Sequence, residues 1–201
     1  MIIDRGWISG VRRVPSPNCD CRPPGASLDL VVIHGISLPP GRFGGPWIDD
    51  LFVNRLDPSA HPYFAEIASL EVSAHALIAR DGALTQYVDF GLRAWHAGAS
   101  SWQGRERCND FSVGIELEGA DDVPYEPVQY EQLAALVKAL RETYPTLRRA
   151  DVVGHSDIAP GRKTDPGPAF DWGLLRRSIS KRRRRTADGG ADTPARRSGG
   201  T

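Results

Sequence analysis

Three chemically active side chains lie within eleven positions in the last quarter of the sequence: His155, Lys163 and Asp165. The segment around them, VGHSDIAPGRKTDPGP (153–168), is too rich in proline and glycine to form a helix or a full strand. Charged and metal-binding groups on such a loop indicate a functional site. Because catalytic zinc sites commonly use three protein ligands and leave a fourth position to water, His155 and Asp165 are candidates for two of the ligands.

The spacing of Lys163 and Asp165 suggests different roles for the two side chains, with Asp165 at the metal and Lys163 at the substrate. Asp165 precedes Pro166, which biases the backbone of Asp165 towards extended geometry. In an extended segment, residues two apart project to the same side. We therefore expect Lys163 and Asp165 to face one space and Thr164 to point away, so that Lys163 can reach a substrate oxygen beside the metal. The alternative is a solvated ion pair, which would contribute little.

A second histidine follows a strand in the same way as His155. The run LVVI (30–33) predicts a buried central strand that ends at His34, and residues 151–154 predict a short strand that leads to His155. Two histidines at strand ends are able to meet at one edge of a sheet. Each is also compatible with a structural, hydrogen-bonded role.

The segment FSVGIELEG (111–119) alternates in polarity and predicts a strand. Three apolar residues point to one face, and Gly114, Glu116 and Glu118 point to the other. An acidic group on such a strand, close to a metal, suits a general base. The alternation leaves both Glu116 and Glu118 open and favours Glu116 only modestly.

The other predicted elements surround these residues. We expect a long surface loop at 37–47, a hairpin from 72 to 88 that turns at Asp81-Gly82, an amphipathic helix at 129–144, and a last helix at 171–183 with Asp171 as its N-cap. Their order predicts an α/β (α+β) domain with a central mixed β-sheet flanked by α-helices.

The remaining histidines have different expected roles. His61, before a proline at a helix start, is expected at the surface or as a cap, and His75 is expected to be structural. His96, beside Trp95, is either a wall of the cleft or a packing residue.

Length and composition limit the class of protein. The 201 residues suit one domain, which we place at 1–183, followed by a disordered basic tail at 184–201. From residue 181 onward there are seven basic and two acidic residues, so the rest of the chain is mildly acidic, which is unlike a nucleic-acid-binding domain. The start lacks a secretory pattern and no segment approaches 18 apolar residues. We expect a cytoplasmic monomer with reduced cysteines that does not bind membranes.

Several longer motifs indicate a family resemblance, which the spacing of single residues does not show. They are VRRVPSP (11–17), ISLPPG (36–41), FGGPWI (43–48), RAWHAG (93–98), QGRERCNDFS (103–112), GIELEG (114–119) and the stretch 154–172. From about Gly6 to Trp172 the sequence closely resembles the zinc N-acetylmuramoyl-L-alanine amidase family, which also contains phage lysozyme-like amidases and peptidoglycan recognition proteins. Within that family it is similar to the enzymes that cleave 1,6-anhydromuropeptides during cell-wall recycling.

This resemblance implies a Zn²⁺ site formed by His34, His155 and Asp165. It implies that Glu116 and Lys163 are the catalytic residues, which decides between Glu116 and Glu118. It also implies that the substrate is a small glycopeptide, an anhydromuropeptide, and that its removal controls the muropeptide signal for β-lactamase induction.

Substrate-binding roles are also expected for Arg107, at a stem-peptide carboxylate, and for Trp95 and His96. Two positions depart from the family pattern: Gly35 replaces the more frequent asparagine, and Glu71 stands where a basic residue is frequent. The alternative function is a muropeptide-binding module without catalysis. Its known examples typically lack part of the metal set, whereas all three ligands are present here.

Overall fold

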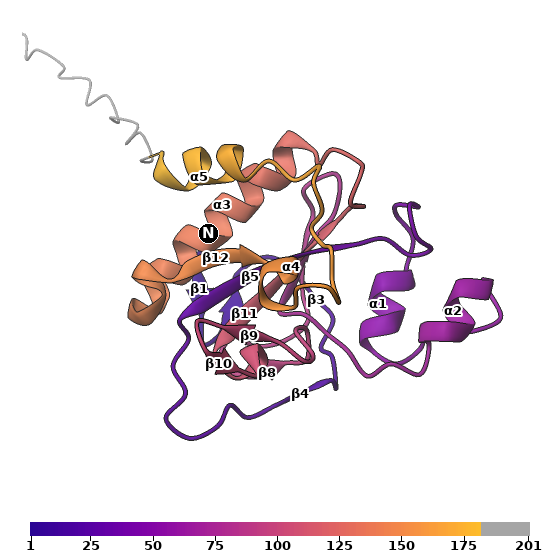
Figure 1. The fold of residues 1–201 in the computed structure, drawn as a ribbon, viewed down its shortest axis with the longest axis horizontal. Coiled ribbons are helices and arrows are strands. Elements are labelled where there is room, and N and C mark those ends of the chain that lie inside the picture. Colours follow the sequence, from indigo (N-terminus) through magenta and orange to yellow (C-terminus); the bar gives the residue numbers. More distant parts are fainter. Residues whose placement is uncertain (182–201) are drawn as a thin grey trace, which may run out of the picture.

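A computed structural model describes residues 1–181, so the tail predicted at 184–201 lies outside the described residues. Its centre is a six-stranded mixed β-sheet, which confirms the predicted fold class (Figure 1). Four neighbouring strands are parallel, the fifth is antiparallel to the fourth, and a short edge strand completes the sheet. In spatial order they are β12 (Asp151–Gly154), β5 (Leu30–Ile36), β11 (Ser112–Glu118), β6 (Ala76–Ile78), β7 (Leu84–Gln86) and β3 (Arg12–Arg13).

The two longest strands, β5 and β11, lie side by side in parallel, and their register pairs His34 with Glu116. Paired residues of neighbouring strands project to the same face of a sheet, so these two side chains share one face. The prediction that this central strand ends at His34 was wrong, because β11 continues to pair with β5 as far as Ile36. His34 therefore lies inside a strand, where its pairing with Glu116 of β11 fixes its backbone.

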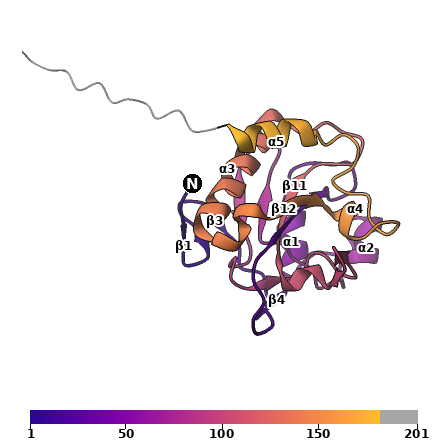
Figure 2. The same ribbon diagram turned by 60° about the vertical axis from the view of Figure 1, so that its left-hand side comes forward.

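The other face of these strands packs on α3 (Pro127–Thr143), with α5 (Trp172–Ser180) beside it (Figure 2). The predicted helix at 129–144 is confirmed and begins two residues earlier, where the side chain of Gln129 accepts a hydrogen bond from the Glu126 N–H. Burial of the apolar helix stripe against alternate strand residues forms the main core. This core includes Val31, Ile33, Val113, Ile115, Leu117, Leu133, Leu136, Val137, Leu140 and Leu175.

The helix α5 ends at Ser180, three residues before its predicted end. Its N-cap is Asp171, as predicted, whose side chain accepts a hydrogen bond from the Leu174 N–H. The helix packs along α3 in both ribbon views (Figures 1 and 2). These helices leave the face of the sheet that carries His34 free for other elements.

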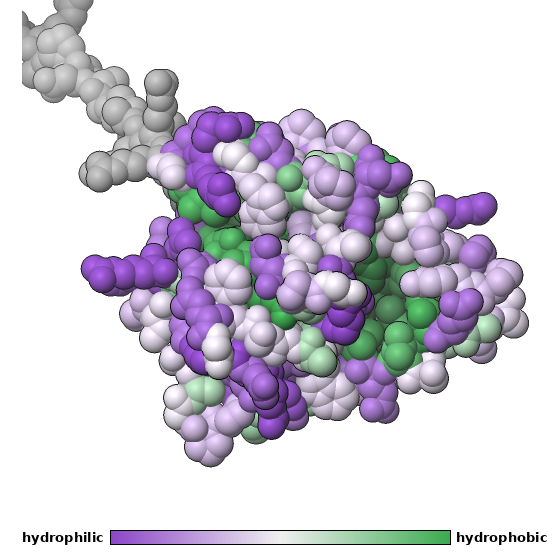
Figure 3. Space-filling model, in the orientation of Figure 1, coloured by the Kyte–Doolittle hydropathy of each residue, from purple (hydrophilic) through white to green (hydrophobic). Residues whose placement is uncertain are grey.

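On that side lie two short helices, α1 (Trp47–Phe52) and α2 (Pro62–Ile67). His61 precedes α2, and its ring accepts a hydrogen bond from the Tyr63 N–H, so its predicted capping role is confirmed. The loop between β5 and α1 contains no helix or strand at residues 37–46, as predicted. Beside these helices, Figure 3 shows apolar side chains gathered in a hollow.

Short elements complete the chain. The predicted hairpin at Asp81-Gly82 is confirmed as the antiparallel pair β6 and β7.

No helix within residues 1–181 is both long enough and apolar enough to span a membrane. The remaining elements are β1 (Ile3–Asp4), β2 (Trp7–Ile8), β4 (Cys19–Asp20), β8 (Arg93–Ala94), β9 (Ser101–Trp102), β10 (Arg105–Glu106), the 3-10 helices Cys108–Asp110 and Pro145–Arg149, and α4 (His155–Ile158).

Candidate metal centre and active site

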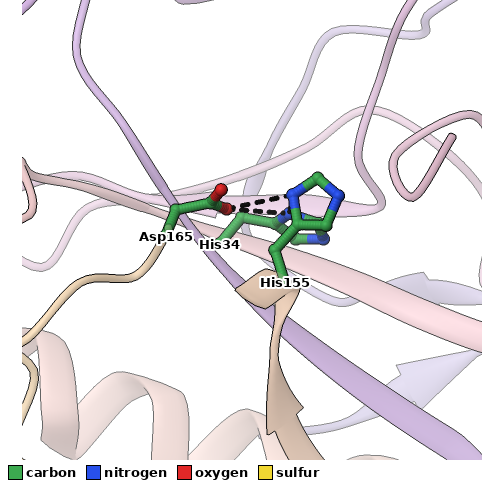
Figure 4. A group of neighbouring side chains, drawn as sticks. All are labelled: His34, His155 and Asp165. Carbon is green, nitrogen blue, oxygen red and sulfur yellow. Dashed lines mark hydrogen bonds and ion pairs between the residues drawn. The ribbon is translucent and has the colours of Figure 1, made fainter. Parts of the chain in front are cut away.

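Three side chains from separate parts of the sequence converge on one point (Figure 4). His34 comes from β5, His155 from the first residue of α4 directly after β12, and Asp165 from the loop that follows α4. The Nδ1 atoms of the two histidines are 3.0 Å apart. The Asp165 Oδ2 atom is 3.3 Å from Nδ1 of His34 and 3.1 Å from Nδ1 of His155. The structure thus brings together the three residues predicted as metal ligands.

This triangle fits a zinc ion. Tetrahedral zinc binds histidine nitrogen and carboxylate oxygen at about 2.0–2.2 Å, which places neighbouring ligand atoms about 3.3–3.6 Å apart. The observed separations of 3.0–3.3 Å lie within a few tenths of an ångström of that spacing. Two histidines and one carboxylate form a donor set typical of catalytic zinc sites, in which the fourth position is open.

Two of the three groups, His34 and Asp165, hold the protonation states that a metal requires. Burial lowers the pKa of His34 to about 4, so its imidazole is neutral near pH 7. For Asp165, burial alone would raise the pKa, but the close contacts with the His155 and His34 rings outweigh burial and hold the pKa below its usual range. A neutral imidazole and an ionised carboxylate are the forms that bind metals.

Glu116 lies beside this triangle on β11, in register with His34. The residue is 8% exposed, and its Oε2 atom has no hydrogen-bond partner within residues 1–181. Burial raises the pKa of Glu116 well above its usual range; the nearby Asp165 carboxylate raises it further, and Lys163 opposes the shift. A buried carboxyl with a raised pKa and a free oxygen is suited to exchange protons near neutral pH.

Glu118, the other candidate on the same strand face, has a different environment. Its Oε1 atom accepts a hydrogen bond from the Gly44 N–H, and its Oε2 atom accepts one from the Arg80 N–H. Both oxygens are thus used to hold two backbone segments. This contrast supports Glu116 as the reactive carboxylate from geometry alone.

We predict that Glu116→Gln stabilises the metal-free protein. The raised pKa means that folding favours the protonated form, so wild-type stability falls as pH rises above the unfolded pKa of about 4.3. Glutamine carries no charge and avoids this loss. Urea unfolding of chelator-treated proteins should show a difference that grows between about pH 5 and about pH 8, towards about 1–3 kcal/mol. An unchanged difference across that range would contradict a buried, unpaired Glu116.

Lys163 and Asp165 line the same cleft, as predicted, but Thr164 lines it too. The expected alternation was wrong because the segment turns instead of remaining extended. The Lys163 N–H donates to the Ala159 carbonyl, and the Gly167 N–H donates to the Thr164 carbonyl. Lys163 is exposed, with its ammonium group free to approach a molecule in the cleft.

The cleft around these residues has a volume of about 510 Å³ and one apolar wall. Its polar end contains the metal triangle, Glu116 and Lys163. Most of this apolar wall was not predicted from the sequence. This wall contains Leu38, Leu51, Phe52, Tyr63, Ile67, Leu70, Val72 and Trp95.

The three predicted substrate-binding residues occupy different places. Trp95 and His96 line the cleft, but the His96 ring is buried against His34, with 3.0 Å between His96 Nδ1 and His34 Nε2. Arg107 lines a separate surface pocket together with Arg162, and its guanidinium is 3.3 Å from the Asp110 carboxylate. The assignment of Arg107 to a stem-peptide carboxylate stays a prediction.

One departure from the family pattern has a structural explanation. A Cβ atom at Gly35 would lie 2.3 Å from the hydroxyl oxygen of Tyr125, which donates a hydrogen bond to the Pro166 carbonyl. Any larger residue at position 35 would displace this contact next to Asp165. Glu71 is exposed, and nothing in the structure explains its acidic character.

The fold, the cleft and the two-histidine, one-carboxylate ligand set are typical of hydrolases that use a metal ion. The family model for N-acetylmuramoyl-L-alanine amidase matches residues 24–168, a range that includes the ligand triangle, Glu116 and Lys163. The chain belongs to this amidase family.

Comparison with individual proteins shows which members of the family this chain is similar to. The chain is 61% identical to the 1,6-anhydro-N-acetylmuramyl-L-alanine amidase AmpD of Escherichia coli K12 over 181 residues, which cover 90% of this chain and 98% of the relative. A crystal structure of a selenomethionine AmpD derivative matches with a TM-score of 0.87 at 60% identity, and it covers 90% of this chain and 100% of that one. The E. coli amidase AmiD, solved with anhydro-N-acetylmuramic acid-L-Ala-D-γ-Glu-L-Lys, matches with a TM-score of 0.55 at 32% identity, over 78% of this chain and 60% of that one.

Proposed function

We propose that the protein is a zinc-dependent amidase that hydrolyses the amide bond between 1,6-anhydro-N-acetylmuramic acid and L-alanine of soluble muropeptides. The observation that carries this proposal is the unpaired, buried Glu116 beside the His34, His155 and Asp165 triangle. The similarity to AmpD over 90% of the chain supports the anhydro sugar as the substrate. The anhydromuropeptide bound in the AmiD structure supports the same chemical class.

A zinc ion held at this site would act as a Lewis acid, which would lower the pKa of a water molecule and polarise the lactyl carbonyl. The three ligands identified by geometry would hold the ion, with Asp165 contributing the negative charge. The ligand set leaves room for substrate because it uses three protein atoms.

Glu116 is the proposed general base and acid. Its free oxygen is positioned to take a proton from the attacking water and then to pass that proton to the leaving amine of L-alanine. Because burial raises its pKa, the protonated form needed for the second transfer is accessible near neutral pH. The amine would leave with the proton that Glu116 took from the water, so that the water supplies hydroxide to the carbonyl carbon and a proton to the amine.

Lys163 is the proposed stabiliser of the developing negative charge on the carbonyl oxygen. Its ammonium lies on the loop that also carries Asp165, and both line one cleft. A cation at this point acts most strongly on the transition state, in which the oxygen gains charge. The apolar wall of the cleft would accommodate the non-polar faces of the substrate.

In the cell, this activity would return stem peptides and anhydro sugars to wall synthesis and lower the muropeptide signal that induces β-lactamase. The cytoplasmic location and the monomeric state predicted from the sequence belong to this proposal. Both fit a substrate that is a small soluble glycopeptide.

A defined anhydromuropeptide incubated with zinc-loaded protein tests the proposal by mass spectrometry. We expect two products, a 1,6-anhydro-N-acetylmuramic acid species and a free stem peptide that begins with L-alanine. Their summed mass equals that of the substrate plus one water.

Two controls make this test decisive. Glu116→Gln protein should give no products in the same time. Intact sacculi should be cleaved far more slowly than the soluble substrate. Binding of the anhydromuropeptide without any cleavage by the wild-type protein would instead identify a muropeptide-binding module.

A further inference from the structure

Behind the metal triangle, a chain of hydrogen-bonding groups continues from His34 into the protein interior. The His34 Nε2 atom is 3.0 Å from Nδ1 of His96. The His96 Nε2 atom is 3.1 Å from Oγ of Ser112, and the Ser112 hydroxyl donates to the Cys108 carbonyl. His34, His96, Ser112 and Cys108 are all buried. We call these four residues the histidine relay.

The short contact between Ser112 and Cys108 sets the arrangement of protons in the relay. The Cys108 carbonyl oxygen lies 2.5 Å from Ser112 Oγ, a separation that requires a proton between the two oxygens, so the Ser112 hydroxyl donates to it and accepts from His96. Nε2 of His96 therefore carries its proton, and Nδ1 of His96 is an acceptor. The proton of neutral His34 must then lie on Nε2, which leaves a lone pair on Nδ1. That is the atom directed at Asp165 and His155.

The strand β11 is built to accommodate the relay. Ser112, Gly114 and Glu116 alternate along it and so share the face on which His34 lies. A Cβ atom at Gly114 would be 2.4 Å from Cγ of His96, so only glycine leaves room for the ring. The backbone of His96 is fixed as well, because its N–H donates to the Asn109 side chain at 3.1 Å.

The second histidine ligand is held differently. Nε2 of His155 is 3.2 Å from the Ala97 carbonyl, which fixes its proton through the main chain. His34 has no such backbone acceptor in the described part of the chain. Its orientation depends on a side chain, His96, and on the hydroxyl that orients His96 in turn.

We infer that His96 and Ser112 are positioning residues that fix the proton of His34 on Nε2 and thereby prepare Nδ1 to bind the metal. This inference rests on the proposed function for the identity of the metal, zinc. It assigns His96 a role in orienting a ligand, in place of the substrate contact expected from the sequence. Groups that orient metal ligands in this way commonly contribute 10–100-fold to metal affinity.

Zinc affinity, measured by competition with a chromophoric chelator, is the first test. We expect Ser112→Ala and His96→Leu to bind zinc about 10–100-fold more weakly than wild type. His96→Asn should recover part of this loss, because its side-chain oxygen is able to accept from His34 in place of Nδ1. The matched control is His61→Ala, which removes a helix cap but no contact of the metal triangle or the relay, and should leave zinc affinity unchanged.

The second test observes the proton directly and needs neither zinc nor substrate. In metal-free protein labelled with ¹⁵N-histidine, the imidazole shifts should show His34 protonated on Nε2. Ser112→Ala should shift His34 towards a mixture of the two neutral tautomers, while circular dichroism confirms folding. Wild-type affinity in both Ser112→Ala and His96→Leu, or an unchanged His34 tautomer in Ser112→Ala, would overturn the inference.

These measurements separate the relay from the proposed function. If the wild-type protein binds zinc but does not cleave anhydromuropeptide, the proposed substrate is wrong while affinity and tautomer still test the relay. If the relay is wrong, the catalytic tests on Glu116 are unaffected. The tautomer of metal-free His34 remains informative in either case.

Discussion

Glu116→Gln is expected to lower kcat by about 10²–10⁴-fold while the protein keeps its zinc. The substitution preserves the size and buried position of the side chain but removes its ability to exchange protons. The three metal ligands lie on other elements, so their geometry should not change. Turnover of a defined anhydromuropeptide and zinc content by elemental analysis, measured on the same preparation, test this expectation.

Glu118→Gln is the matched control, because Glu118 lies two residues away on the same strand face. Its two oxygens hold the Gly44 and Arg80 backbone N–H groups, so the substitution should lower the free energy of unfolding and leave turnover within about tenfold of wild type. A Glu116→Gln protein with near wild-type kcat would place the base elsewhere. A larger loss of turnover in Glu118→Gln than in Glu116→Gln would reverse the two assignments.

Asp165→Ala is expected to abolish zinc binding at micromolar concentration and, with it, turnover. The substitution removes the anionic ligand and leaves two neutral imidazoles, a set too weak for a stable catalytic site. The sheet and its helices should persist, because their core is formed by apolar contacts on the opposite face of β5 and β11. Elemental analysis after dialysis gives the metal content, and far-UV circular dichroism reports the fold.

Lys163→Ala provides the contrast within the same loop. It should keep one zinc per chain and still lose about 10²–10³-fold in kcat, because it removes charge stabilisation rather than a ligand. Full zinc occupancy in Asp165→Ala would rule out the three-ligand assignment. Loss of the circular dichroism signal when wild-type protein is treated with a chelator would show that the metal is needed for folding, contrary to this model of a pre-existing core.

Much of the fold follows from periodicity. The stripe on α3, the turn at Asp81-Gly82 and the alternation along β11 are local patterns, and the structure confirms each of them. Local patterns do not show how far a strand continues, since that depends on its partner. For this reason the sequence does not indicate that β5 continues to Ile36.

The sequence predicts which types of residue form the site. It predicts less well which of them contact each other. Glu116 and Glu118 are equivalent by alternation, and what separates them is which of the two meets the Gly44 and Arg80 N–H groups. These contacts come from loops 74 and 38 residues away in the sequence. The contact between His96 and His34 spans 62 residues and has no local signature either.

The division between strands and loop in this cleft has a consequence for how the protein can diversify. His34 and Glu116 are set by the register of two central strands, where an insertion or deletion would disrupt the main core. The wall that a substrate's outer parts would touch comes partly from the loop after β5, which is joined to the sheet by contacts that include the hydrogen bond from the Gly44 N–H to Glu118. Changes in that loop can therefore alter which muropeptides fit the cleft without altering the reaction. Substrate range and catalytic chemistry can thus change independently of each other in this fold.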